Sequence, residues 1–194
     1  MNIIIASSNK HKIEEINEIV KDFKINFISA SEYDVDMESV VEDGKTFVDN
    51  ALIKARFLAS KLNEYVLADD SGLCLEGSDE LGVHTARFRQ DLTYPERCQV
   101  VYEMVKDNPK ASFICSLALI TPSKEEIVVT GEVKGEIKEP SGSNGFGYDP
   151  VFYSYELKKI FGTATSEEKH SVSHRGRAVR MLVEEIKKRG LVNE

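Results

Sequence analysis

Two adjacent carboxylates, Asp69 and Asp70, follow a short apolar run and precede a serine and a glycine. The apolar residues 66–68 predict a buried strand, and the Asp-Asp-Ser-Gly sequence predicts the turn that ends it. Strand ends in α/β proteins form ligand sites. Because neighbouring carboxylates repel each other, a cation beside them is favoured, and Mg²⁺ takes oxygen ligands. A solvated turn is the alternative interpretation.

A second polar segment, residues 7–12, connects a predicted strand to a predicted helix over residues 13–23. The first turn of a helix offers N–H groups and the positive end of the helix dipole, which favour an anion. Ser7, Asn9 and Lys12 add a hydroxyl, an amide and an ammonium group. The segment is therefore a candidate phosphate site, and an ordinary helix cap with solvent-facing lysines is the alternative.

The loop over residues 139–150 is rich in glycine and carries two aromatic residues and an aspartate. Glycine lets the backbone approach a ligand closely. Phe146 and Tyr148 flank a glycine and could stack on a flat base, while Asp149 could accept a hydrogen bond from it. Aromatic packing in a hairpin loop is the alternative interpretation.

Two familiar motifs are excluded by a single residue. Residues 44–46, Gly-Lys-Thr, resemble the end of a P-loop, but that motif needs a glycine where Ser39 stands. Residues 34–36, Asp-Val-Asp, resemble the start of an EF-hand loop, but Ser39 also occupies the position of its glycine. Neither a P-loop nor an EF-hand is therefore expected.

The elements between these segments must position them. Thr46 is predicted to cap a helix that ends near residue 62, and residues 173–175 are predicted to open a last helix. Residues 111–121 and 126–138 predict a hairpin. Further strands are predicted over residues 3–6, 26–30, 66–68 and 151–152, whereas residues 154–173 are predicted to be irregular.

Together these features indicate hydrolysis of a nucleotide phosphate by a metal-assisted water. Carboxylates favour a metal, basic and amide groups favour phosphates, and aromatic rings beside an acceptor favour a nucleobase. No serine or cysteine nucleophile is set up, because the adjacent Ser173 and His174 cannot form a triad. The acidic group is Glu42, Asp69 and Asp70, and the basic group near the last helix is Lys169, His174 and Arg175.

The composition limits the classes of partner and location. The 194 residues suit one domain, over residues 1–194, and the formal net charge of −8 disfavours binding to nucleic acid polymers. No apolar run approaches the roughly 20 residues of a membrane span. The three cysteines lack metal-type or redox-type spacing, so buried free thiols in a reducing cytoplasm are expected.

The chain resembles the inosine triphosphate pyrophosphatase (Ham1-like) family over nearly its whole length. The motifs that carry the resemblance are Ser7-x-Asn9-x-x-Lys12, Glu42 followed by Asn50-Ala51-x-x-Lys54-Ala55, Ala68-Asp69-Asp70-Ser71-Gly72-Leu73, Gly145-Phe146-Gly147-Tyr148-Asp149-Pro150, and Lys169 with Ser173-His174-Arg175.

The resemblance implies a fold and a reaction. The fold is α/β: an elongated mixed β-sheet flanked by helices, with two lobes around a central cleft, in a single domain that forms a homodimer. The reaction is Mg²⁺-dependent hydrolysis of non-standard purine nucleoside triphosphates (ITP, dITP and XTP) to the monophosphate and pyrophosphate, which cleanses the nucleotide pool.

The resemblance also implies roles for individual residues. Asp70 would be the general base, and Glu42 and Asp70 would hold Mg²⁺ with support from Asp69. Glu42 and Asp70 should then converge, facing Lys12 and Lys54. The implied substrate-binding residues are Ser7, Ser8, Asn9, Lys10, His11, Lys12, Lys54, Ser71, Phe146, Gly147, Tyr148, Asp149, Lys169, His174 and Arg175.

The candidate base-binding residues also indicate which purines the site would select. Hypoxanthine and xanthine present an O6 acceptor and an N1–H donor, which adenine reverses, so an aspartate acceptor beside an Arg, His or backbone donor favours 6-oxopurines. One alternative is a Maf-type pyrophosphatase acting on modified pyrimidine nucleotides or dTTP. The other is a nucleotide-binding regulator without catalysis, which the carboxylates and lysines argue against.

Overall fold

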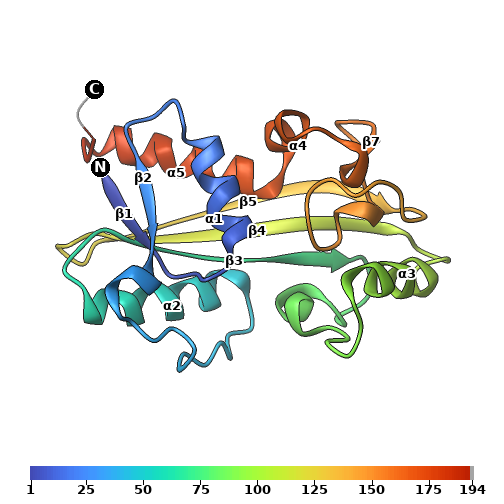
Figure 1. Ribbon diagram of the computed structural model, residues 1–194, viewed down its shortest axis with the longest axis horizontal. Coiled ribbons are helices and arrows are strands. Elements are labelled where there is room, and N and C mark those ends of the chain that lie inside the picture. The colour runs from blue at the N-terminus through green and yellow to red at the C-terminus, as the bar shows by residue number, and fades with distance from the viewer. Residues whose placement is uncertain (193–194) are drawn as a thin grey trace. The chain divides into compact units, whose positions relative to one another are not determined.

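The computed structural model describes residues 1–192 and contains a seven-stranded mixed sheet with helices beside it (Figure 1). The strand order is β2-β1-β3-β4-β5-β6-β7. β1 is parallel to β2 and to β3, whereas β5, β6 and β7 are antiparallel neighbours. The predicted mixed α/β sheet is confirmed. The strands are β1 (Asn2–Ile5), β2 (Asn26–Ser29), β3 (Val66–Leu75), β4 (Lys110–Ile120), β5 (Glu126–Ile137), β6 (Phe152–Ser154) and β7 (Lys159–Ile160).

Polar side chains define where the helices begin. Thr46 caps α2 by accepting a hydrogen bond from the Asp49 N–H group at 3.1 Å, as predicted. Thr93 and Thr165 form capping boxes at α3 and α4. Among the described residues, no helix has the length and apolar character that a membrane crossing requires. The helices are α1 (Lys10–Ile19), α2 (Phe47–Lys61), α3 (Tyr94–Met104), α4 (Ser166–Val172) and α5 (His174–Lys188).

The chain forms two compact units, each with its own core. The first unit comprises Met1–Asp70, Cys115–Gly131 and the described residues from Arg175 onward. The second unit comprises Ser71–Ile114 and Glu132–His174.

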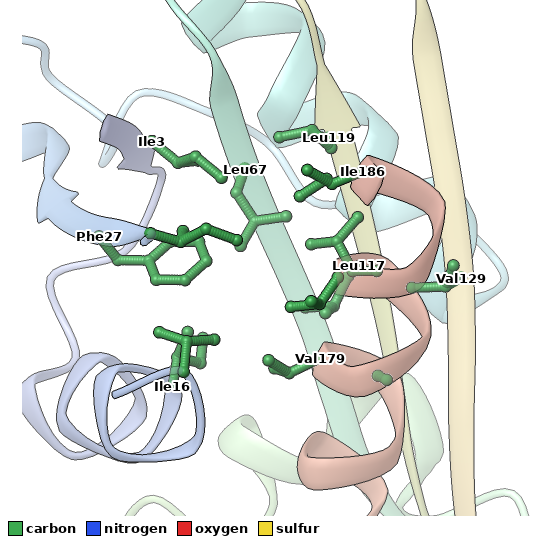
Figure 2. Close-up of a cluster of buried hydrophobic side chains, with 14 of the residues drawn as sticks. Ile3, Ile16, Phe27, Leu67, Leu117, Leu119, Val129, Val179 and Ile186 are labelled. Carbon is green, nitrogen blue, oxygen red and sulfur yellow. The ribbon is translucent and has the colours of Figure 1, made fainter. Parts of the chain in front are cut away.

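In the first unit, helices cover both faces of the strands. On one face, Leu67 of β3 packs with Ile16 of α1 and Val179 of α5, as Figure 2 shows. On the opposite face, Val66 and Ala68 of β3 pack against the alanine-rich side of α2. Residues of β3 therefore alternate between two different helical environments, which follows from the two-residue period of a strand.

In the second unit, α3 and a group of aromatic rings form the core. Phe113 of β4 packs against Phe152 of β6, with ring centroids 4.6 Å apart, and Phe161 lies beside both. These rings lie next to the glycine-rich loop, because Tyr148 and Val151 belong to the same cluster. The loop that was predicted to contact a base thus packs into this core.

Three sequence predictions on local structure were wrong. The Asp-Asp-Ser-Gly sequence lies inside β3, which continues to Leu75, because long-range contacts to both carboxylates stabilise an extended backbone there. Residues 154–173 are not irregular: they contain β7 and α4, which are too short to give a periodic signal. Residues 149–151 form a 3₁₀ turn, and the strand predicted at 151–152 begins only at Phe152.

Candidate functional site

β3 directs Asp69 and Asp70 to opposite faces of the sheet. Leu67 belongs to the core of α1 and α5, whereas Val66 and Ala68 belong to the core of α2. Since successive strand residues alternate in direction, Asp69 faces α1 and α5, and Asp70 faces α2. The two neighbouring carboxylates therefore have different surroundings.

The Asp69 carboxylate is buried and held by two cations. Lys12 of α1 donates to Oδ1 at 3.2 Å, and Nη2 of Arg175 lies 3.5 Å from Oδ2. Glu15, on the same helix as Lys12, accepts a hydrogen bond from Arg175 at 2.6 Å. Burial alone would raise the pKa of Asp69, but the charges of Lys12 and Arg175 outweigh burial and hold that pKa well below its usual range. Asp69 is therefore a fixed negative charge.

The Asp70 carboxylate, on the α2 side, is less completely paired. Its Oδ1 atom lies 4.0 Å from Nζ of Lys54, and its Oδ2 atom is buried without a hydrogen-bond partner. Burial raises the pKa of Asp70 to about 6, although the charge of Lys54 and a hydrogen bond from Asn50 oppose this shift. A buried carboxylate oxygen without a partner is suited to a cation or to a proton.

The Lys54 ammonium group contacts oxygen atoms of two different segments of the chain. Its Nζ atom lies 3.0 Å from Oε1 of Glu42 and donates to the backbone carbonyl of Asp69 at 2.5 Å. Burial would lower the pKa of Lys54, but the charges of Asp69 and Glu42 outweigh burial and raise the pKa. Glu42 and Asp70 thus both lie beside Lys54, whereas Lys12 pairs with Asp69.

These oxygens fit a divalent cation. Mg²⁺ is commonly bound by one or two carboxylates together with substrate phosphates. Glu42 and Asp70, which both lie beside Lys54, would supply the two carboxylates, and Oδ2 of Asp70 is an oxygen that a cation would satisfy. Within residues 1–192, no group of three or more His, Cys, Asp or Glu residues is arranged to hold a metal ion. Two carboxylates therefore fit a metal whose remaining ligands are waters or substrate phosphates.

The start of α1 is capped by its own polar residues. Oδ1 of Asn9 accepts a hydrogen bond from the Lys12 N–H group at 3.3 Å, and Oγ of Ser7 accepts one from the Asn9 N–H group at 3.1 Å. Residues 8–11 are exposed. The predicted helix cap is confirmed, but Lys12 pairs with Asp69 and does not face solvent. The predicted contact of this segment with phosphates stays a prediction.

In the second unit, Asp149 ties the glycine-rich loop to α4. Its Oδ2 atom accepts hydrogen bonds from the Phe146 N–H group at 3.0 Å and from Nζ of Lys169 at 2.7 Å. Gly145 and Gly147 have φ angles of +71° and +61°, and a Cβ on Gly145 would collide with Oδ2 of Asp149. Glycine is therefore required where the loop folds over this carboxylate.

Two other residues predicted to hold a base lie in the core of the second unit. The Tyr148 ring meets the Tyr94 ring edge-on, with centroids 5.6 Å apart, and burial raises the pKa of Tyr148 to about 12. The buried His174 ring stacks on Phe113, with centroids 4.7 Å apart. Ser71 is half-buried on β3. Contacts of these residues with substrate stay predictions.

The sequence patterns missed two residues that contact the site. Glu15 was not considered, although it lies three residues after Lys12 and so shares its face of α1. Asn50 lies one turn before Lys54 on α2, and it was quoted in a motif without a role. Arg175, predicted to help hold the base, pairs with Glu15 inside the first unit. Glu15 and Asn50 could have been found from the sequence, because each lies three or four residues from a predicted site residue on the same helix.

The sequence pattern of the Ham1 family matches residues 3–185. The chain belongs to the Ham1 family. The match includes every predicted site residue in both units, and it confirms the resemblance noted from the motifs.

Proteins similar to this Ham1 family member are known in sequence and in structure. A dITP/XTP pyrophosphatase from Clostridium perfringens (strain 13 / Type A) is 43% identical over 199 residues, covering 95% of this chain and 96% of the relative. A Ham1 protein structure from Coxiella burnetii has a TM-score of 0.85 at 37% identity, covering 97% and 99% of the two chains. The Staphylococcus aureus Ham1 protein has a TM-score of 0.82 at 33% identity, covering 97% and 100%.

Proposed function

We propose that this protein hydrolyses the non-standard purine nucleoside triphosphates ITP, dITP and XTP to the monophosphate and pyrophosphate. Membership of the Ham1 family and the activity in the name of the Clostridium perfringens relative support this proposal. The observation that carries it is Oδ2 of Asp70, a buried carboxylate oxygen without a hydrogen-bond partner beside two cationic side chains and a second carboxylate.

Glu42 and Asp70 would hold Mg²⁺, with Asp69 as a supporting charge. Bound there, Mg²⁺ would offset the negative charge of the phosphates, which otherwise hinders the approach of a nucleophile. Lys12 and Lys54 would add positive charge toward the triphosphate. Lys12 remains oriented by its ion pair with the carboxylate of Asp69.

Asp70 would act as the general base. Its carboxylate accepts a proton from water while the water oxygen bonds to the α-phosphorus. The bond between the α-phosphorus and the α–β bridging oxygen breaks, and pyrophosphate leaves. A nearby cation lowers the pKa of a carboxylate, so Asp70 would stay ionised in the substrate complex. The polar residues at the start of α1 would bind the phosphates, and Ser71 would also contact the substrate.

The cluster of Asp149, Lys169 and Phe146 would recognise the base. Lys169 can donate to the O6 atom of a 6-oxopurine, and the Asp149 carboxylate fixes that ammonium group at 2.7 Å. Adenine presents a donor at the same position and would oppose the lysine. Gly147, Tyr148, His174 and Arg175 would support this recognition.

The proposal also covers the oligomeric state of the protein and its location in the cell. The protein would be a single domain with two lobes, would form a homodimer in the cytoplasm, and would remove non-standard purines from the nucleotide pool. The free cysteines fit a reducing compartment. It would require neither a nucleic acid polymer nor a membrane.

A panel of nucleoside triphosphates with product identification tests the function. The proposal expects dITP, ITP and XTP to be cleaved fastest, with Mg²⁺ present, and to yield pyrophosphate. Faster cleavage of dTTP than of dITP would favour a Maf-type enzyme. Tight binding of ITP without any phosphate product would favour a regulator, and release of orthophosphate would contradict cleavage between the α and β phosphorus atoms.

A further inference from the structure

Asn50 lies beside two segments of the first unit, and each of these segments carries a carboxylate, Glu42 or Asp70. Its side chain is 2% exposed and lies near the start of α2. Its Oδ1 atom accepts a hydrogen bond from the Gly44 N–H group at 2.8 Å, and its side chain lies close enough to the Asp70 carboxylate to lower the pKa of that group. Gly44 lies two residues after Glu42. One buried amide thus links the Glu42 segment to Asp70.

An asparagine amide has both a hydrogen-bond acceptor and a hydrogen-bond donor, and this position can use both. Oδ1 is an acceptor and is used by a backbone N–H group, so the Nδ2 group is the end that can donate to a carboxylate. Aspartate at this position would present a second negative charge to Asp70. Leucine would leave the Gly44 N–H group without its acceptor.

The Glu42 segment lies directly against this amide. A Cβ on Gly44 would be 2.6 Å from Oδ1 of Asn50 and 2.6 Å from Cβ of Asp49, closer than side chains pack. The absence of a side chain at Gly44 therefore lets its N–H group reach Asn50. Lys54, one turn further along the same face of α2, contacts both Glu42 and Asp70.

We propose that Asn50 is a positioning residue for metal binding, whose amide fixes the Glu42 segment relative to Asp70 so that the two carboxylates share one divalent cation. The proposal rests on the proposed function, for which that cation is required. Hydrogen-bond partners of metal ligands typically change metal affinity by about 10–100-fold when they are removed.

The direct test is the affinity of the full-length protein for Mn²⁺, without nucleotide, from electron paramagnetic resonance of the free ion. Mn²⁺ takes the same oxygen ligands as Mg²⁺. Asn50→Ala is expected to weaken Mn²⁺ binding by about 10-fold or more. With dITP, the Mg²⁺ concentration for half-maximal activity should rise by a similar factor, while kcat at saturating Mg²⁺ changes less.

Two further variants separate positioning from general stability. Gly44→Ala breaks the same link from the half-buried loop and should also weaken Mn²⁺ binding, so it decides the question if Asn50→Ala does not fold. Asn17→Ala is the matched control, because Asn17 also forms two hydrogen bonds to a backbone, at Phe27, away from the carboxylates. It should lower the Tm without changing Mn²⁺ affinity.

The outcomes distinguish this proposal from the proposed function. If the wild type releases pyrophosphate from dITP and folded Asn50→Ala and Gly44→Ala bind Mn²⁺ within about twofold of the wild type, the role of Asn50 is overturned and the function stands. If the wild type binds Mn²⁺ but releases no pyrophosphate, the function fails, and the affinity comparison still decides the role of Asn50.

Discussion

Asp69 and Asp70 are adjacent on β3, yet their carboxylates face opposite sides of the sheet and have opposite pKa shifts. Burial by itself favours a higher pKa for both carboxyl groups. For Asp69, the charges of Lys12 and Arg175 reverse that effect and lower the pKa. For Asp70, burial prevails and the pKa rises to about 6. Asp69 is thus a permanent charge that positions Lys12 and Arg175, and Asp70 retains an oxygen for a ligand or a proton.

Asp70→Asn should stabilise the metal-free protein at neutral pH. Burial raises the pKa of Asp70 from 3.8 to about 6, so ionisation disfavours the folded state. The cost is small below pH 3.8, grows as the pH rises and is complete above about pH 6. The variant should gain about 1–3 kcal/mol in the free energy of unfolding at about pH 7.5.

Urea unfolding in the presence of a chelator measures this gain. The difference between Asp70→Asn and the wild type should shrink at about pH 4, where the carboxyl of the wild type is largely protonated in the folded state. A variant that is less stable than the wild type at neutral pH would show that the ionised carboxylate is better solvated or paired than its contacts indicate.

Arg175→Met should strongly destabilise the first unit. Arg175 is 2% exposed and neutralises the buried carboxylate of Asp69, which is 1% exposed, so its removal takes away one of the two cations that pair with that carboxylate. Breaking a buried ion pair on one side typically costs about 3–5 kcal/mol. The low pKa of Asp69 stabilises the folded state above the ordinary aspartate pKa, and this stability is lost as the pH falls below that value and through the lowered pKa of the folded carboxyl. The free energy of unfolding of Arg175→Met should therefore depend less on pH in the acidic range than that of the wild type.

Arg56→Met is the matched control for this measurement. Arg56 forms a bidentate ion pair with Glu126, but its side chain is 58% exposed. Exposed pairs contribute about 0–1 kcal/mol, so urea unfolding should barely change. Equal losses for Arg56→Met and Arg175→Met would contradict a special role for the buried network.

Gly145→Ala should impair base recognition more than folding. A Cβ there collides with the Asp149 carboxylate that holds Lys169, in addition to the strain of a φ angle of +71°. We expect kcat/KM for dITP to fall by about 10-fold or more, because misplacement of a binding group by about 1 Å costs up to about 10²-fold.

Gly77→Ala supplies the comparison for that variant. Gly77 has a φ angle of +78° and open space where the methyl group of alanine would lie, so alanine there adds backbone strain alone. It should cost about 1 kcal/mol of stability and leave kcat/KM unchanged. Similar kcat/KM values for Gly77→Ala and Gly145→Ala would mean that the Asp149 contact does not serve the substrate.

The sequence predicted the elements whose signals are local. Thr46 as the cap of α2 follows from its hydroxyl group and from the apolar stripe after it, and both are properties of neighbouring residues. The alternation of apolar and polar residues likewise located most of β5. Such predictions need no knowledge of the rest of the fold.

The features that the sequence did not predict depend on distant residues. Asp69 and Asp70 resembled a turn, and they lie within a strand because Lys12, Lys54 and Arg175 come from three other elements to meet them. No local pattern reports such contacts. The opposite directions of the two carboxylates became predictable only once β3 was known to continue through them.

Release of pyrophosphate from dITP by Asp70→Asn tests most directly whether Asp70 is the proton acceptor in the cleavage. The control is Asp107→Asn, an exposed aspartate in the second unit. With Mg²⁺ present, Asp70→Asn should release pyrophosphate about 10²–10⁴-fold more slowly than the wild type, whereas Asp107→Asn should match the wild type. Pyrophosphate release by Asp70→Asn within a few-fold of the wild-type rate would contradict the account.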